Sequence, residues 1–225
     1  MQTDEYDFNI IRSPRRKRIA LRLTPEGKVE ILCPQGTGEA VLKQLISANL
    51  HLIDKLKRRQ SKQPAPQRLS FAENDLLPLL GKNFPLHLSS RLTLFDGERF
   101  IIPRSSDPDE LKSALTSLYK AIALKYLTSR TATLAGECGF SYNKLRITSA
   151  TTRWGSCNSQ KTIAYSWKLI MCPKPLIDYV IIHELSHLLE LNHSPEFWKI
   201  VQKFCPDYKE RRSMLKKFAR TLPAW

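Results

Sequence analysis

The chain has 225 residues, 42% of them hydrophobic, and its formal net charge at pH 7 is +15. No apolar run approaches the ~18 residues of a membrane span, so the sequence excludes a membrane-spanning protein. Residues 1–7 are polar and acidic and lack the basic and then apolar order of a secretory signal. The cysteines are scattered and include no Cys-x-x-Cys pair, which favours a reducing, cytoplasmic location.

Positive charge gathers in three clusters, at residues 15–18, 55–59 and 209–220. Such clusters attract phosphate-bearing partners, here nucleic acid or nucleotides, through Coulomb steering and counterion release. No motif of stacking aromatic residues accompanies them. A solvated basic surface that only keeps the protein in solution is therefore the favoured interpretation, and a nucleic acid or nucleotide partner is the alternative.

Residues 1–104 are expected to form a β-rich N-terminal region with one helix. Residues 18–23 and 28–33 alternate in hydropathy around turn residues 24–27, which predicts a β-hairpin. A polar, proline-containing connection over residues 61–67 is followed by short β-like segments as far as residue 103. The helix is predicted over residues 39–59, and its apolar positions at helical spacing are Val41, Leu45, Ala48, Leu52 and Leu56.

Residues 105–225 are expected to form a second domain. Asp107 as cap and Pro108 in the first turn predict a helix that runs to about residue 135. Strands are predicted over residues 144–148 and 162–167, and a final helix in the basic tail over residues 208–219. Two strands ahead of the central helix would provide an edge strand that can hold an extended peptide by backbone hydrogen bonds.

The central helix of this domain contains the pattern His-Glu-x-x-His. His183 and His187 are four residues apart, so both imidazoles lie on one helix face and can bind a single tetrahedral metal ion. Glu184 lies next to that face, where it can reach a metal-bound water without being a ligand, as a general base must. The surrounding apolar residues predict a buried helix, and they are Val180, Ile181, Leu185, Leu188 and Leu189.

A catalytic zinc keeps three protein ligands and leaves one position to water, so a third donor is needed. His193 is the candidate. We expect Asn192 to adopt the left-handed conformation that ends helices, and Ser194 and Pro195 to begin another helix, so that His193 turns back to the ion. The alternative without a metal is a pair of helix histidines bonded to surface carboxylates.

The sequence resembles the YgjP-like metallopeptidase family, which is related to SprT-like and other His-Glu-x-x-His zincins. The resemblance rests on Arg-Trp-Gly-Ser-Cys at 153–157, Thr-Ile-Ala-Tyr-Ser-Trp at 162–167, the run 177–187 and Asn-His-Ser-Pro-Glu-Phe-Trp at 192–198. It is close over residues 144–210 and looser before them. It implies that the zinc ligands are His183, His187 and His193, with Glu184 as the catalytic acid and base.

The fold is therefore expected to be α+β, with a minimal zincin in the C-terminal domain and a smaller β-rich N-terminal region. The expected function is hydrolysis of polypeptide substrates by a water activated on one zinc ion per chain. One alternative is a metal-dependent nucleotide phosphohydrolase, although such sites usually have carboxylate ligands with magnesium or manganese. The other is a nucleic-acid-associated protein with a structural zinc, which would close all four positions with protein ligands.

Three further residues are candidates for contacting the substrate or its oxyanion, or for orienting a ligand: Arg153, Tyr165 and Asp178. Arg153 could bind a substrate carbonyl or a phosphate, but a structural salt bridge is the favoured role. Asp178 could cap its helix or accept a hydrogen bond from a ligand. Gly155 would let backbone approach closely, and Cys157 is expected to have a structural role.

Overall fold

A computed structural model describes residues 2–3, 6–24, 28–61 and 69–223. The chain divides into two compact units, Met1–Pro66 and Gln67–Trp225. This differs from the division expected at residue 104, because the sheet of residues 76–103 shares one hydrophobic core with the helices that follow it. Residues 62–67 of the predicted connection and residues 25–27 of the predicted turn lie outside the described residues, and Ser61 is the last residue of the helix before them.

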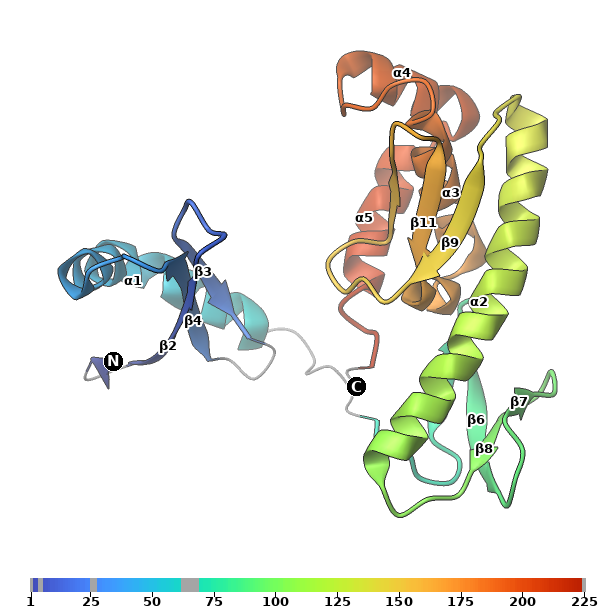
Figure 1. Ribbon diagram of the computed structural model, residues 1–225, viewed down its shortest axis with the longest axis horizontal. Coiled ribbons are helices and arrows are strands. Elements are labelled where there is room, and N and C mark those ends of the chain that lie inside the picture. The colour runs from blue at the N-terminus through green and yellow to red at the C-terminus, as the bar shows by residue number, and fades with distance from the viewer. Residues whose placement is uncertain (1, 4–5, 25–27, 62–68, 224–225) are drawn as a thin grey trace. The chain divides into compact units, whose positions relative to one another are not determined.

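The first unit is a four-stranded sheet with one helix (Figure 1). Its strand order is β1-β2-β4-β3, and β3 pairs with β4 antiparallel, which confirms the predicted hairpin. Strand β2 pairs with β4 in parallel, a pairing that the sequence did not indicate. The elements are β1 (Gln2–Thr3), β2 (Tyr6–Ser13), β3 (Ala20–Leu23), β4 (Val29–Pro34) and α1 (Glu39–Ser61).

Helix α1 is present as predicted, but the face that it buries is a different one. Leu42, Ile46 and Ile53 are at most 1% exposed and share a core with β4. Val41 and Leu52, which were expected to face the core, are 52% and 42% exposed. Neighbouring positions in this helix are both apolar, so two different helix faces show helical spacing of apolar residues. Contact with the sheet decides which of the two faces is buried.

The second unit contains two sheets, with strand orders β5-β6-β8-β7 and β10-β11-β9. Strand β11 pairs with β9 in parallel and with β10 antiparallel, so β10 is an edge strand. The strands and helices predicted for this region are present, but α3 ends earlier than expected and Trp167 belongs to a 3-10 helix. Its elements are β5 (Leu76–Leu79), β6 (Lys82–Ser89), β7 (Leu94–Phe95), β8 (Phe100–Pro103), α2 (Pro108–Cys138), β9 (Lys144–Thr148), β10 (Gly155–Cys157), β11 (Thr162–Ser166), the 3-10 helix η1 (Trp167–Met171), α3 (Lys174–Ser186), α4 (Pro195–Phe204) and α5 (Tyr208–Phe218).

Helix α2 runs along both sheets of this unit (Figure 1). Its N-cap is Asp107, whose side chain accepts a hydrogen bond from the Asp109 amide at 2.9 Å, as the sequence predicted. On its buried face the Tyr119 hydroxyl donates to the Pro78 carbonyl oxygen at 2.7 Å. The β5–β8 sheet is thus part of the same packed body as the helices. Among the described residues, no helix combines the length and the apolar character that crossing a membrane requires.

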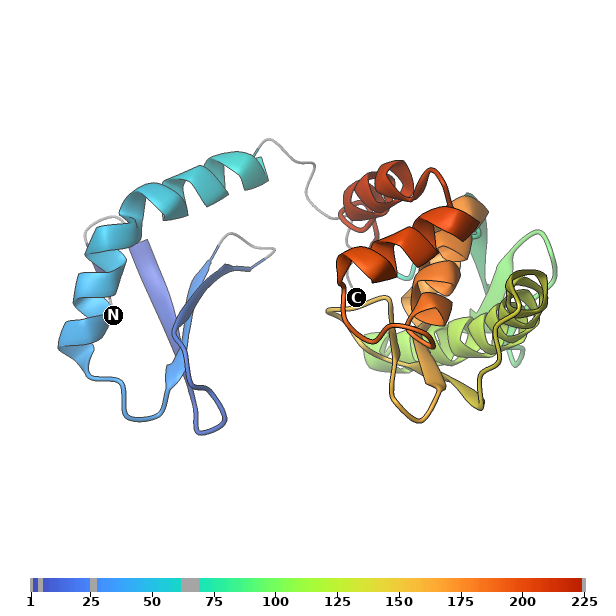
Figure 2. The ribbon, with the colours of Figure 1, turned by 90° about the horizontal axis from the view of Figure 1, so that it is seen from above.

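The turn between β5 and β6 fixes the start of α3. The Leu80 amide donates to the Ile170 carbonyl at 2.8 Å, and the Gly81 amide donates to the Met171 carbonyl at 3.2 Å. Gly81 has a φ of +80°, and a Cβ there would lie 2.8 Å from the Cα of Pro173, the residue before α3. Only glycine fits this contact without strain, because it has neither the side chain nor the conformational penalty. Helix α3 is then packed by α2, α4 and α5 (Figure 2).

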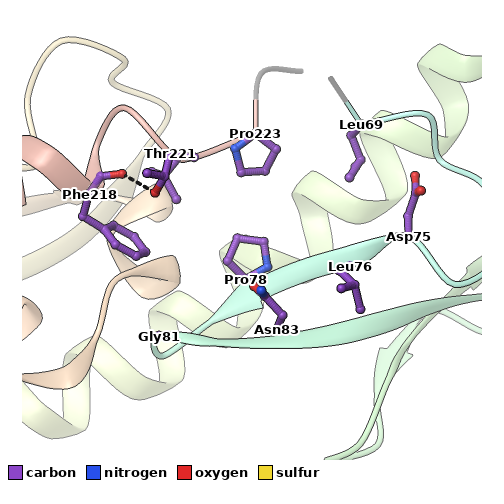
Figure 3. A pocket seen from close by; sticks show the side chains of 10 residues that line it. Leu69, Asp75, Leu76, Pro78, Gly81, Asn83, Phe218, Thr221 and Pro223 are labelled. Atoms are coloured by element: carbon purple, nitrogen blue, oxygen red, sulfur yellow. Dashed lines mark hydrogen bonds between the residues drawn. The ribbon is translucent and has the colours of Figure 1, made fainter. Parts of the chain in front are cut away.

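A cavity of about 270 Å³ lies between the β5–β6 hairpin and the segment after α5 (Figure 3). Asp75 is the charged side chain among its described lining residues. Its carboxylate already accepts hydrogen bonds from the Ser70 and Ala72 amides and from the Ser70 hydroxyl. This cavity therefore has structural polar groups but no carboxylate that is free for chemistry.

Candidate metal centre

The three predicted histidines come together. The ligand atoms of His183, His187 and His193 all lie within 4.8 Å of one another. The Nε2 atoms of His183 and His193 are 3.1 Å apart. Tetrahedral zinc with Zn–N bonds of 2.0–2.1 Å separates its ligand nitrogens by about 3.3 Å. Two ring nitrogens that face each other need a proton or a cation between them, so this donor set fits a metal ion.

The turn that brings in His193 differs from the one expected. Helix α3 ends at Ser186, with His187 as its C-cap, rather than near Asn192. The Leu189 and Glu190 amides both donate to the Ser186 carbonyl, at 3.1 and 3.2 Å, so one hydrogen-bonded turn over residues 187–189 closes the helix before the chain reaches His193. Asn192 is not among the described residues with positive φ, and Leu189, expected to be buried, is 68% exposed.

One histidine is oriented by the backbone. The Nδ1 atom of His187 lies 3.0 Å from the Glu190 carbonyl oxygen. A carbonyl only accepts, so Nδ1 holds the proton and Nε2 has the free lone pair that a metal needs. The buried Nδ1 of His183 has no hydrogen-bond partner within the part of the chain that the structure describes. The turn after α3 thus sets the tautomer of one ligand.

Burial keeps the histidines neutral. Desolvation is the main cause that lowers the pKa of His183 to about 3, and the neighbouring His187 and His193 lower it further. Desolvation also lowers the pKa of His187. Neutral imidazoles have the lone pairs that bind cations, so at neutral pH these two side chains are in the form that a metal site requires.

Helix α4 supports the triad with aromatic rings. Ser194 caps it by accepting a hydrogen bond from the Phe197 amide at 3.2 Å, and proline follows at the first position, as predicted. Phe197 is fully buried and stacks on His187 with ring centroids 4.4 Å apart. Trp198 stacks on His193 at 5.8 Å. Through these contacts both aromatic residues pack the turn that contains His193 against the core.

Glu184 is 5% exposed and lies beside the triad. Its burial raises the pKa of the carboxyl to about 8, and the charge of Arg153 acts in the opposite direction. A Cβ at Gly155 of β10 would come within 2.6 Å of Glu184 Oε1. The close backbone approach expected at Gly155 is therefore made to this carboxylate, which β10 covers.

Tyr165 is too buried to touch a substrate, and Cys157 is not in the thiolate form that a nucleophile or metal ligand requires. Tyr165 pairs with Gly155 across the strands but is fully buried, and its hydroxyl accepts from Thr131 Oγ1 at 3.4 Å. This corrects its candidacy for substrate contact. Burial, followed by the charge of Glu184, raises the pKa of Cys157 to about 11, so this residue is a thiol at neutral pH.

Asp178 and Arg153 have roles other than those expected: Asp178 forms a salt bridge, and Arg153 lines the cleft. Asp178 neither caps α3, which begins at Lys174, nor contacts a histidine. Its carboxylate instead accepts from Arg130 Nε and an Arg130 terminal nitrogen at 2.8 and 2.9 Å, which joins α3 to α2. Arg153, for which a structural salt bridge was favoured, is exposed and forms no ion pair with a described carboxylate. It lines the cleft beside the histidines.

That cleft has a volume of about 740 Å³ and lies over His183, Glu184 and His193. Its lining includes residues 153–155, which lead into β10, and Lys209, Arg212 and Lys216 of α5. The sequence showed this basic cluster but gave no sign that the final helix returns to the histidines. The arrangement can hold a metal ion at the bottom of an open, positively charged groove, with a carboxylate beside it.

A family model described as the YgjP-like metallopeptidase domain matches residues 17–218. The crystal structure of the metallopeptidase zymogen of Pyrococcus abyssi abylysin is 22% identical, with a TM-score of 0.38, over 43% of this chain and 98% of that chain. The zymogen of Methanocaldococcus jannaschii jannalysin is 17% identical, with a TM-score of 0.35, over 41% and 96%. No curated protein matches the sequence.

Proposed function

This chain belongs to the YgjP-like metallopeptidase family, and from that premise we propose that it cleaves peptide bonds with one zinc ion held by three histidines. Family membership makes it a metal-dependent peptide hydrolase. The observation that supports the ligand set is the convergence of His183, His187 and His193, with donor atoms within 4.8 Å. Three neutral imidazoles without a carboxylate suit zinc better than magnesium or manganese.

A zinc ion in this position supplies Lewis acidity, which polarises a carbonyl and lowers the pKa of water to about 7. The chain supplies the proton transfer. Glu184 takes a proton from the attacking water on a carboxylate oxygen and delivers it to the leaving amine. The pKa of about 8 is that of the buried carboxyl without a metal ion, and a nearby dication would favour the ionised form that accepts a proton.

Strand β10 is suited to position the substrate. It is the edge strand of its sheet and contacts α3. An extended peptide that pairs with its free edge would be held by backbone hydrogen bonds above the histidines. Gly155 keeps this strand close to Glu184, so the peptide and the base would be brought to the same place.

The test is the Glu184→Gln variant. It removes the proton acceptor but keeps the shape of the side chain, so we expect unchanged zinc content and at least a ~100-fold loss of peptidase activity. Glu196→Gln, an exposed change on α4, is the matched control and should stay active. Zinc is measured by elemental analysis and activity with casein and peptide libraries. Full activity in Glu184→Gln would remove the assigned base.

The nucleotide phosphohydrolase alternative has one supporting observation, the positive charge of the cleft. The donor set argues against it, because metal sites that handle phosphates usually have carboxylate ligands. Assays with a panel of nucleoside triphosphates and zinc, manganese or magnesium separate the two reactions. Peptide cleavage without phosphate release is the outcome that we expect.

A further inference from the structure

The charged side chains that line the cleft beside the histidines are mostly positive. Its described lining includes the cationic side chains of Arg153, Lys209, Arg212 and Lys216 but a single carboxylate, Glu184. Three of the four cations come from α5. A peptide that enters the cleft therefore meets mainly positive side chains, most of them on α5. Under the proposed function, the positive charge of the cleft affects which peptides are cleaved.

Three of these cations, Arg153, Arg212 and Lys216, form no salt bridge with a described carboxylate. The neighbouring Arg211 shows the contrast. Its guanidinium donates to Asp207 at 2.8 Å and to the Pro175 carbonyl at 3.1 Å, which ties α5 to the start of α3. One arginine of this pair is structural, and the other faces the cleft.

Arg212 is held in place by an aromatic ring. Its guanidinium carbon lies 5.0 Å from the ring centroid of Trp198, within the range of a cation–π contact. Trp198 in turn stacks on Tyr208 at 5.2 Å and on His193 at 5.8 Å. Stacking leaves the guanidinium edge free to donate, and a preorganised fork binds a carboxylate with two parallel hydrogen bonds.

We propose that the peptide substrate presents a carboxylate to the cationic face of α5, and that Arg212 and Lys216 determine this specificity. The carboxylate belongs to an aspartate or glutamate side chain near the scissile bond or to the free C-terminus of the peptide. The inference rests on the proposed peptidase function and adds the substrate class to it. Long-range attraction by the other cations would raise the association rate of acidic peptides.

Four matched series of internally quenched peptides distinguish the two sources of the carboxylate. They contain glutamate or glutamine at variable positions, each with a free or an amidated C-terminus. We expect the preferred acid to raise kcat/KM roughly three- to tenfold, mainly through KM, and the preference to weaken at high salt. Faster cleavage of the glutamate peptides than of the glutamine peptides would show that the carboxylate is a side chain. Faster cleavage of the peptides with a free C-terminus than of the amidated ones would show that it is the C-terminal carboxylate. Equal cleavage of all four series would overturn the proposal.

Variants of α5 test the assigned residues. Arg212→Gln and Lys216→Gln should each bring kcat/KM for the preferred acidic peptide down towards that of its neutral counterpart. Lys217→Gln is the matched control, because Lys217 is exposed on the same helix but does not line the cleft. Lys216 is exposed, so its variant stays informative if the loss of stacking in Arg212→Gln disturbs folding. A preference that survives in both variants would contradict the assignment.

A binding measurement separates this inference from the proposed function. Fluorescence anisotropy with the Glu184→Gln protein reports affinity for labelled glutamate and glutamine peptides in the absence of turnover. If no peptide is cleaved by the zinc-loaded wild type, the peptidase function fails, and tighter binding of the glutamate peptide still supports the carboxylate site. Triphosphate hydrolysis without any discrimination between the peptides would overturn both.

Discussion

Gly155 lies against the carboxylate of Glu184. A Cβ at residue 155 would stand 2.6 Å from Oε1 and 2.7 and 2.8 Å from Cγ and Cδ of the glutamate, closer than real Cβ atoms approach other heavy atoms. The glutamate is 5% exposed and has little room to move away. The missing side chain on β10 is therefore what allows a buried carboxylate beside the histidines.

Gly155→Ala should displace that carboxylate. We expect overpacking to lower the free energy of unfolding by about 1–3 kcal/mol, and peptidase activity to fall by more than tenfold because the base is moved. Denaturant unfolding and kcat/KM are the measurements. Gly136→Ala is the control, since a Cβ there meets nothing within 4 Å and alanine favours a helix. Equal effects of the two substitutions would refute the steric argument.

His193→Ala should release the metal but keep the fold. His193 is exposed and lies in the turn after α3, so its loss leaves little buried space unfilled. We expect zinc affinity to drop by more than the ~10–100-fold typical of losing a group that only orients a ligand. Competition with a chelator measures the affinity, and circular dichroism measures the fold. His51→Ala, an exposed change on α1, should bind zinc like the wild type.

The Arg130–Asp178 pair should stabilise the protein without acting in catalysis. The two side chains are 34% and 19% exposed, so the pair is neither fully exposed nor fully buried. Breaking it in Asp178→Asn should lower the free energy of unfolding by about 1–2 kcal/mol, a cost between those of surface and of buried ion pairs. A double-mutant cycle with Arg130→Gln isolates the interaction. Zinc content should stay unchanged. A large loss of zinc would instead indicate that the pair positions the histidines.

The metal-free protein should lose stability as the pH rises from about 6.5 to 8. The pKa of Glu184 is raised from 4.5 to about 8, so over this range the folded state retains a proton that the unfolded state has released. Stability then falls with pH, by on the order of 1–2 kcal/mol. Below pH 6.5 the lowered pKa of His183 acts in the opposite sense, because the unfolded state binds the extra proton. Chemical denaturation at several pH values measures the slope, and Glu184→Gln should remove it above pH 6.5.

The local chemistry of the site could be predicted from sequence. The spacing of His183 and His187, the cap at Ser194 and the helix start at Asp107 depend on neighbouring residues, and short-range rules describe them well. The family resemblance is confirmed by the model match to residues 17–218. The assignment of ligands and base stays a prediction, supported by the geometry of the three rings.

What sequence could not supply depends on contacts between distant segments. Two apolar stripes compete on α1, and only the sheet decides that Leu42 rather than Val41 is buried. The end of α3 after Ser186 depends on the path to α4, not on the conformational preference of Asn192. The return of Arg212 to the histidines needs α5 to pack on α3, which no local pattern reports.

The hydrogen bond from the Tyr119 hydroxyl to the Pro78 carbonyl indicates where a shortened catalytic fragment should begin. A truncation at residue 105 would strip β5–β8 from α2 and leave Leu115 and Tyr119, both wholly shielded in the intact protein, in contact with water. We expect such a fragment to aggregate, because it exposes apolar surface to water. An expression boundary shortly before Leu69 retains that sheet and is the shorter version worth making.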